Sequence, residues 1–404
     1  MSKTVKVTLL TFSIALVLLT VAGGLGVKAS TNDGAYRQLM VYSEVLSRIR
    51  SDYVEEPNIP HVTDGALHGL LESLDANSSY LNPQEYKQYK QLTSEGNANV
   101  GAAISKRFGY AAVISVMPGG PAEKAGVESG DIIEGIEGRS TREMSLAEVK
   151  GLMSGQPGSV INISVVRPRK AQPQKIAITR DVLKEPPVSN KLIESGIGYI
   201  RVDGFSKGRS QEIANRIKEL TKQGAKKLVL DLRNSGDGEE AEGIATANLF
   251  LNRGMIGYLQ GQKYPRETFN ADASKAITNM PVVVLVNRST AGPAEILASA
   301  ILDNARGDVL GDKTFGAGSI QKVLPMQDGS ALILSIAKYY SPSGKAIQDN
   351  AVTPNILVAD ATDDFISPED DTEAPAEDIK KKEAGPDEQL RRAIEVLKNR
   401  DVKA

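Results

Sequence analysis

The side chains that most often carry catalysis are scarce in this chain of 404 residues. It has no Cys, which excludes thiol nucleophiles, disulfides and Cys-zinc sites. Its two His, His61 and His68, lie near the N-terminus, so a Ser-His-Asp triad or a multi-His metal site is not expected in the larger C-terminal part. If a serine acts as a nucleophile, its general base should be a different residue type, and Lys is the best candidate. We expect no metal and no cofactor.

The charge balance limits the kind of partner to expect. Lys and Arg number 48 and Asp and Glu number 50, which gives a formal net charge of -2. A nucleic-acid-binding protein usually shows a strong basic excess, so we expect no nucleic-acid partner. Hydrophobic residues make up 41% and charged residues 24%, the balance of an ordinary globular protein, and the length suits two to three domains.

The N-terminus has the pattern of a targeting signal. Lys3 and Lys6 precede an uncharged run, residues 7–27, which would form a helix about 31 Å long and can span a bilayer. The same run has the form of a signal peptide with small residues at a cleavage site near residues 27–29. Residues 1–29 are therefore interpreted as a signal peptide or a membrane anchor. In both cases we expect an exported protein, periplasmic or otherwise extracytoplasmic, attached to the inner membrane through residues 7–27 if they are not cleaved.

Hydrophobic periodicity divides the rest of the chain into segments. Residues 35–97 show helical spacing of apolar residues and are interpreted as a helical cap. Residues 98–183 contain short β-rich runs between Gly and Pro, which predicts a small β-rich module. In residues 190–357, apolar strands alternate with helices, which predicts a largely parallel sheet with both faces covered. Residues 358–386 have the composition of an acidic, disordered linker, and residues 387–404 predict a short amphipathic helix.

Five motifs follow one another along the chain. They span residues 44–81, 117–138 (MPGGPAEKAGVESGDIIEGIEG), 228–234 (LVLDLRN), 311–321 (GDKTFGAGSIQ) and 337–348 (AKYYSPSGKAIQ). Together they resemble the carboxyl-terminal processing, or tail-specific, serine proteases. The first is similar to the family's helical cap, the second to the core of a PDZ domain and the others to the protease core. The resemblance covers nearly all of the chain after residue 35. It implies an α/β multidomain protein in which a PDZ module lies between the helical cap and a crotonase-like protease core with a largely parallel sheet.

A PDZ module implies a peptide partner. Such domains bind an extended peptide as an added strand and capture its terminal carboxylate with backbone amides. The candidate loop here consists of small and apolar residues, namely Val100, Gly101, Ala102, Ala103 and Ile104. Leu146, Val149 and Leu152 belong either to the wall of the peptide groove or to the core, and the core is the simpler interpretation. Protein or peptide C-termini are therefore the expected partners of the PDZ groove.

The resemblance also implies a Ser-Lys dyad, and this chain departs from it. In the family, the serine stands at a helix start in a motif like S-A-S-A-S-E-I, and the lysine in a motif like K-T-F-G-K-G-x-x-Q, held by the final Gln. Alignment on Glu295 places the nucleophile position at Gly292, which has no side chain. The general-base position falls on Ala317, and only Gln321 remains of the three.

Two further departures concern stabilisation of an oxyanion. The residue after the family nucleophile donates its backbone N–H, and here it is Pro293, which has none. The strand-end loop is similar to N-N-P-G-G in the family but reads NSGDG over residues 234–238, so that Asp237 either opposes an oxyanion or points to solvent. Loss of a serine nucleophile costs about 10⁶-fold in turnover, and loss of one oxyanion donor about 10²–10³-fold. One such loss is enough to abolish proteolysis by the family mechanism.

The sequence leaves three interpretations open. The first, which we favour, is a degenerate protease that binds peptide or protein C-termini in the cell envelope and scaffolds, regulates or competes with an active protease relative. The second is an active serine peptidase with a displaced nucleophile, Ser289 or Thr290, although a hydroxyl in such a loop more commonly bonds to the backbone. The third is a PDZ interaction or scaffold protein in which the protease groove has no role.

Overall fold

The computed structural model describes residues 33–94, 97–107, 109–167, 172–359 and 387–399, and the chain divides into two compact units, Met1–Leu67 and His68–Ala404. The expected signal peptide or anchor (residues 1–29) and nearly all of the expected acidic linker lie outside the described residues. Within the described part of the chain, no helix is both long enough and apolar enough to cross a bilayer.

The predicted helical cap contains three helices, α2 (Asp33–Asp52), α3 (Ile59–Glu72) and α4 (Pro83–Ser94). The side chain of Asn82 caps α4, because its Oδ1 accepts the N–H groups of Gln84 and Glu85, both at 3.0 Å. A short strand, β1 (Ser79–Leu81), interrupts the helices and pairs antiparallel with residues 331–333. The sequence did not predict this strand, because its partner lies about 250 residues further along the chain.

The β-rich module forms one antiparallel sheet. Across the sheet, its strands are β3 (Ala102–Arg107), β4 (Tyr110–Val116), β5 (Ile132–Ile136), β8 (Val160–Val166) and β9 (Gln174–Thr179). The smaller elements are β2 (Ala98–Asn99), α5 (Pro121–Lys124), β6 (Arg139–Ser140), α6 (Leu146–Met153) and β7 (Ser154–Gly155). In α6, Leu146 and Val149 are buried in the core of this module, while Leu152 is partly buried against it. The core interpretation of this stripe is therefore confirmed.

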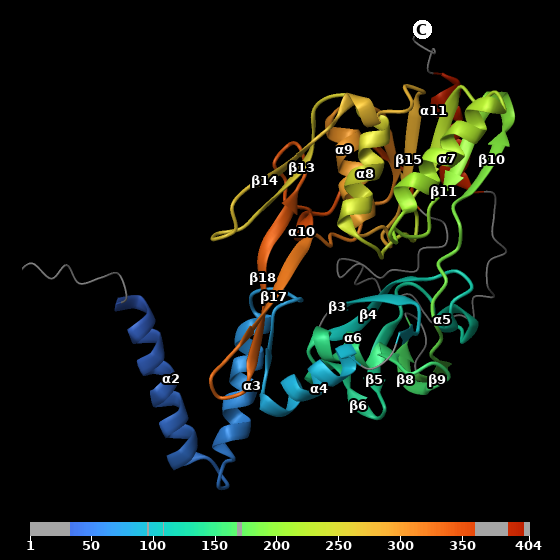
Figure 1. The fold of residues 1–404 in the computed structure, drawn as a ribbon. Coiled ribbons are helices and arrows are strands. Elements are labelled where there is room, and N and C mark those ends of the chain that lie inside the picture. The colour runs from blue at the N-terminus through green and yellow to red at the C-terminus, as the bar shows by residue number, and fades with distance from the viewer. Residues whose placement is uncertain (1–32, 95–96, 108, 168–171, 360–386, 400–404) are drawn as a thin grey trace, which may run out of the picture. The chain divides into compact units, whose positions relative to one another are not determined.

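The α/β part contains the predicted parallel sheet, in the order β10-β11-β12-β15-β16-β19. Its strands are β10 (Ser189–Ile193), β11 (Ile197–Arg201), β12 (Lys227–Asp231), β15 (Val282–Val286), β16 (Asp308–Gly311) and β19 (Ile356–Leu357). All neighbours in this sheet are parallel except β10 and β11. The helices that connect or cover these strands are α7 (Arg209–Lys222), α8 (Glu240–Phe250), α9 (Pro293–Asp303) and α11 (Glu388–Lys398) (Figure 1).

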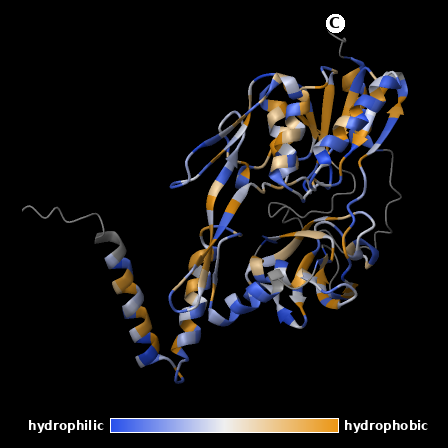
Figure 2. Ribbon diagram, viewed as in Figure 1, coloured by the Kyte–Doolittle hydropathy of each residue, from blue (hydrophilic) through white to orange (hydrophobic). Residues whose placement is uncertain are grey.

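Both faces of the parallel sheet are covered, which explains why its central strands β12 and β15 are mostly hydrophobic (Figure 2). Alternate residues of one strand enter different cores, as Val282 and Val284 of β15 do on one face and Val283 on the other. The first face packs against α7, α8 and α9. The second packs against α11, whose Ala393 and Leu397 are fully buried there.

The remaining strands form a second, antiparallel sheet. They are β1, β13 (Met255–Gln260), β14 (Glu267–Asn270), β17 (Ser319–Pro325) and β18 (Ala331–Tyr340), and the short helix α10 (Ile347–Asn350) follows them. The sequence predicted strands in the region of β17 and β18, and the structure joins them as a long hairpin. This hairpin begins directly after the loop that contains Ala317, so it helps to position that loop.

Candidate functional site

The expected nucleophile position lies at a sharp turn from strand to helix. Gly292 is the residue before α9, and its backbone has φ +59° and ψ -120°. A turn of this kind exposes the nucleophile in other hydrolases, and it is strained for any residue except Gly. A Cβ built on Gly292 would meet no atom within 4 Å. The structure therefore provides the backbone and the space for a nucleophile, but no side chain that could act as one.

The tip of α9 offers little to an oxyanion. Pro293 is buried at the first position of the helix and has no N–H group. The N–H group of Gly292 donates to Oε2 of Glu295 at 3.0 Å. Neither of the first two amide positions at this turn is therefore available to stabilise negative charge.

The expected general-base position lies on the loop between β16 and β17. The side chain of Ala317 is a methyl group, which cannot accept a proton. Its backbone N–H donates to Oε2 of Glu295 at 2.8 Å, the same oxygen that accepts from Gly292. The nucleophile and general-base positions are thus bonded to one carboxylate.

Glu295 joins the two loops from within the fold. Its side chain is fully buried, and Oε1 accepts from the N–H of Gly316 at 2.8 Å and from the hydroxyl of Thr314. Burial raises the pKa of the carboxyl group to about 7, although the hydrogen bonds act in the opposite direction. In the sequence, Glu295 served to align the family motif, and no pattern indicated its bonds to the distant loop.

Gln321 takes part in the β17–β18 hairpin. Its Nε2 donates to the hydroxyls of Ser319 at 2.9 Å and Ser335 at 3.4 Å. Ser319 in turn donates to Oε1 of Gln348 at 3.2 Å. The one dyad-associated residue that remains in its family position is therefore bonded to serines of its own hairpin.

The two fallback nucleophiles are buried. Thr290 is fully buried, and its hydroxyl donates to the carbonyl of Leu232 at 2.8 Å and accepts the N–H of Asn287 at 3.0 Å. Ser289 is 2% exposed, and its N–H donates to Oδ1 of Asn287 at 3.2 Å. The hydrogen bonds of the Thr290 hydroxyl indicate a structural role for this residue. The hydroxyl of Ser289 is buried and therefore not accessible to a substrate.

The strand-end loop, residues 234–238, lies beside the turn that contains Gly292. Asn234 has φ +61° and exchanges two hydrogen bonds with the side chain of Asn287, at 3.0 and 2.8 Å. The carbonyl of Ser235 accepts the N–H of Ala291 at 2.9 Å. A Cβ on Gly236 would lie 2.5 Å from the hydroxyl of Ser115 on β4, so this loop also contacts the β-rich module closely.

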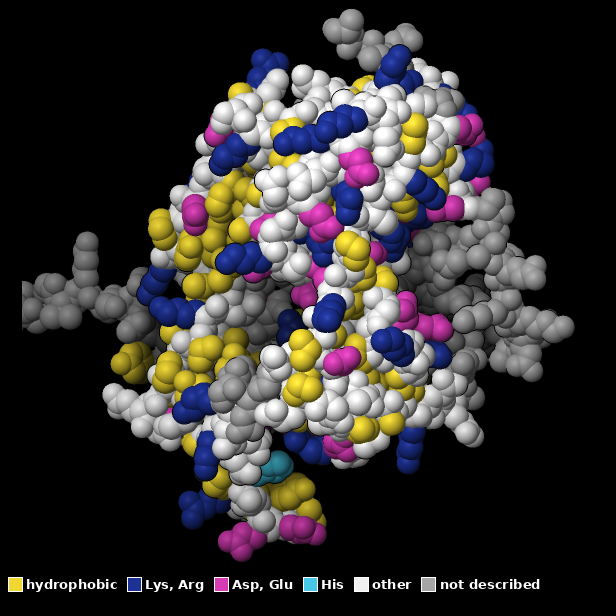
Figure 3. Space-filling view, turned by 45° about the vertical axis from the view of Figure 1, so that its right-hand side comes forward, with side chains coloured by type: hydrophobic (Ala, Val, Ile, Leu, Met, Phe, Trp, Pro, Cys, Tyr) yellow, Lys and Arg dark blue, Asp and Glu magenta, His cyan; other side chains and the backbone are white. Residues whose placement is uncertain are grey.

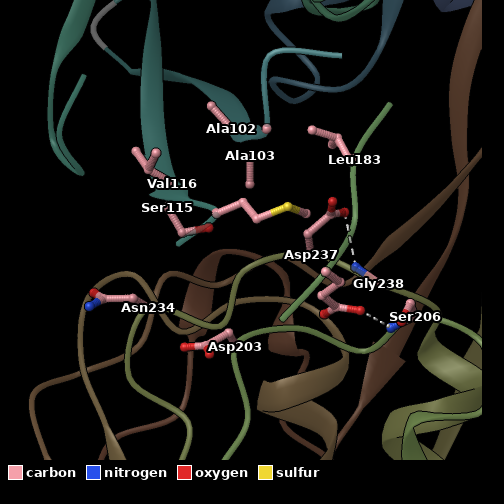
Figure 4. A pocket seen from close by; sticks show the side chains of 13 residues that line it. Ala102, Ala103, Ser115, Val116, Leu183, Asp203, Ser206, Asn234, Asp237 and Gly238 are labelled. Carbon is pink, nitrogen blue, oxygen red and sulfur yellow. Dashed lines mark hydrogen bonds between the residues drawn. The ribbon is translucent and has the colours of Figure 1, made fainter. Parts of the chain in front are cut away.

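A cavity of about 320 Å³ lies next to this loop (Figure 4). The β-rich module and the segment that follows it contribute Gly101, Ala102, Ala103, Ser115, Val116, Met117, Leu183 and Glu185. The α/β part contributes Asp203, Ser206, Asn234, Asp237 and Gly238. Asp237 is exposed on the cavity wall, and its Oδ1 accepts the N–H of Gly238 at 2.9 Å. Sequence patterns did not indicate this cavity, since its lining residues come from separate parts of the chain.

The structure separates the five residues of the expected carboxylate-binding loop. Val100 and Ile104 are buried in the core of the module. The N–H of Val100 donates to the carbonyl of Met153 at 3.2 Å, and that of Gly101 to Oδ1 of Asn99 at 3.0 Å. Ala102 and Ala103 begin the edge strand β3 and line the cavity. Within the described residues, no group of three or more His, Asp or Glu is placed to hold a metal ion.

Comparisons with known proteins support the resemblance seen in the sequence. Residues 196–358 match the family model described as Peptidase family S41, and residues 113–167 match a PDZ domain model. The chain is 31% identical to a carboxy-terminal-processing protease of Bartonella bacilliformis over 82% of this chain and 77% of that protein. It is 36% identical to a carboxyl-terminal-processing protease of Picosynechococcus over 73% and 72%. A solved photosystem II D1 C-terminal processing protease is similar with a TM-score of 0.64 and 28% identity, over 79% of this chain and 92% of that chain.

We expect Glu295→Gln to lower the free energy of unfolding by about 1–3 kcal/mol, because an NH₂ group would face an N–H that now bonds to oxygen. The effect should depend on pH. The folded protein keeps the Glu295 proton up to about pH 7, whereas the unfolded chain loses it near the usual glutamate pKa of 4.5. The stabilisation from this raised pKa is therefore fully present below pH 4.5 and is lost as the pH rises toward 7.

Urea unfolding of the wild-type protein and of Glu295→Gln at about pH 5 and about pH 8 measures this. The difference between the two proteins should be smaller at the higher pH. A difference that does not change with pH would contradict the raised pKa.

Proposed function

The chain belongs to peptidase family S41 with the carboxyl-terminal processing proteases, and from this premise we propose that it is a catalytically degenerate member that binds peptide or protein C-termini in the cell envelope. The observation that carries the proposal is the pair Gly292 and Ala317. The backbone N–H of each residue donates a hydrogen bond to the carboxylate of Glu295. Neither residue has a side chain that can take part in acyl transfer.

The chemistry of acyl transfer requires three groups at this site. A nucleophilic oxygen must attack the peptide carbonyl, a base must take the proton of that nucleophile, and N–H donors must stabilise the oxyanion that forms. Gly292 supplies no oxygen, Ala317 supplies no base, and Pro293 supplies no N–H. The buried, bonded hydroxyl of Thr290 gives no support to a displaced nucleophile.

Peptide binding is supported by features that do not depend on the dyad. β3 is an edge strand of the PDZ sheet, and a PDZ domain binds its ligand by adding a strand at such an edge. Ala102 and Ala103, at the start of β3, border the cavity next to the strand-end loop. A peptide bound at this edge has space for its side chains, and it meets no nucleophile at the turn of Gly292. Such a protein would hold or compete for tails that an active protease relative cleaves.

We expect the purified protein not to cleave a C-terminal peptide and not to react with a fluorophosphonate probe that labels serine nucleophiles. An active member of the family is the positive control. The double variant Gly292→Ser/Ala317→Lys should become labelled, because the space around Gly292 accommodates a side chain. Its turnover should stay about 10²–10³-fold below that of the active relative, since Pro293 still provides no N–H.

The result that would contradict this proposal is cleavage by the wild-type protein that is lost in Ser289→Ala or Thr290→Val. Such a result would identify a displaced nucleophile. Circular dichroism of each variant distinguishes a loss of activity from a loss of structure.

We expect Ala103→Phe to weaken binding of a fluorescent C-terminal peptide at least tenfold, because the larger ring would occupy the cavity beside the edge strand. Ala177→Phe is the matched control, as Ala177 is exposed on β9 at the opposite edge of the same sheet. Fluorescence anisotropy with the full chain measures both affinities. Equal affinity in the two variants would place the peptide elsewhere.

The location in the cell envelope is proposed from residues 1–29, whose basic start and apolar run suit export. We expect protease added to spheroplasts to digest the protein while a cytoplasmic marker stays intact. Removal of residues 2–29 should keep the protein inside the cell and protected. Protection of the full chain in intact spheroplasts would overturn the envelope location and leave the proposed loss of catalysis untouched.

A further inference from the structure

The cavity beside the strand-end loop has walls of different character. Ala102, Ala103 and Val116 of the PDZ module are small or apolar, and Leu183 adds a further apolar side chain. The carboxylates all belong to the segment after the module or to the α/β part. They are those of Glu185 and of Asp203 and Asp237, the last two of which are labelled in Figure 4. A peptide added to the edge of β3 would therefore have acidic groups near its side chains.

Two of the three carboxylates are already neutralised by buried or half-buried arginines. Glu185 forms an ion pair of 2.6 Å with Arg209, and it also accepts the N–H of Ser206 at 3.2 Å. Asp203 forms an ion pair of 2.7 Å with Arg201. Their charges are thus compensated inside the protein and offer little to a ligand.

Asp237 differs from the other two. Its carboxylate is exposed in the cavity and accepts the N–H of Gly238, and no Lys or Arg of the described residues forms an ion pair with it within 4 Å. The charge of Asp237 also acts on Lys150 of α6, whose pKa is lowered by desolvation and raised in turn by this carboxylate. Asp237 therefore interacts with a nearby Lys through its charge without forming an ion pair with it.

A terminal carboxylate is a poor occupant for the part of the cavity near Asp237. Like charges placed side by side at an interface are costly. The N–H groups of Val100 and Gly101, which the sequence predicted as carboxylate donors, are bonded to Met153 and Asn99. A positively charged side chain suits this part of the cavity, because the carboxylate of Asp237 attracts its charged end. Its methylene groups can lie along the apolar side chains of Leu183 and Val116.

We propose that this cavity receives a basic side chain, Lys or Arg, from the C-terminal region of the bound peptide, and that Asp237 recognises its charge. The proposal rests on the peptide binding proposed above and specifies the class of peptide. The recognition is local, since on the face drawn in Figure 3 basic and acidic side chains are mixed over the surface.

Binding of matched peptides to the full chain tests the proposal. The peptides are identical except for one of the last five positions, which carries Lys, its uncharged analogue norleucine, or Glu. At one of these positions we expect the Lys peptide to bind about fivefold more tightly than the norleucine peptide, the effect of an exposed ion pair near the upper end of its range. The Glu peptide should bind less tightly than either, and high salt should reduce these differences.

Substitutions on the same loop identify the residue responsible. Asp237→Asn keeps an acceptor for Gly238 and should abolish the preference for Lys over norleucine. Asp237→Lys should reverse the order in favour of the Glu peptide. Glu239→Gln is the control, because Glu239 is exposed two residues away with the same charge and does not line the cavity. It should keep the fivefold preference.

The outcomes separate this inference from the proposed function. Equal binding of the Lys and norleucine peptides at all five positions, or a preference that persists in Asp237→Asn, would overturn the role of Asp237 while peptide binding stands. If Glu239→Gln loses the preference for Lys to the same extent, the preference comes from the total negative charge of the loop. That result would also overturn the specific role of Asp237. Failure of every peptide to bind the folded protein would overturn peptide binding and this inference together.

Discussion

The buried carboxylate of Glu295 is the interaction on which the geometry of the site depends. It accepts the N–H groups of Gly292, Gly316 and Ala317, and so it joins the turn before α9 to the loop before β17. A buried carboxylate that loses its donors costs several kcal/mol, so neither loop can move away from it without a large penalty. These bonds use backbone groups and a side chain that takes no part in the family's dyad. This geometry therefore does not depend on the side chains at positions 292 and 317.

The parallel sheet determines where this carboxylate lies. The strands β12 and β15 are neighbours and run in the same direction, so the loops that follow them meet at one edge of the sheet. Asn287 bonds to Asn234 across these loops, and Thr290 bonds to the carbonyl of Leu232. Thr290, one of the two spare nucleophiles considered from the sequence, thus helps to hold the loop after β12 against the turn before α9.

The sequence predicted those parts of the fold that depend on residues close together along the chain. The central strands β12 and β15 are largely apolar because both faces of the sheet are buried, and helices lie between the strands in the sequence, so this alternation was visible in the sequence. Gly292 and Ala317 were located by the motif residues around them. Strand β1 and the bonds from Glu295 to residues 316–317 were not predicted, because their partners lie far away along the chain. The cavity was not predicted for the same reason, since Leu183, Asp203 and Asp237 carry no shared pattern.

Gly292 and Pro293 both suit the backbone conformation at the start of α9. A non-Gly residue at φ +59° and ψ -120° stores about 1–3 kcal/mol of strain, and Gly292 removes that strain. Pro293 has a fixed φ that suits the first position of a helix, at the expense of an N–H that only catalysis would use. Both residues suit the local backbone conformation and lack a group that acyl transfer needs, which agrees with the proposed non-cleaving protein, in which stability would no longer be balanced against activity. Near the turn lies a cavity beside the edge strand β3, with the exposed carboxylate of Asp237 on its wall. If the protein binds peptides without cleaving them, as proposed above, selection on this site acts on which peptide it holds.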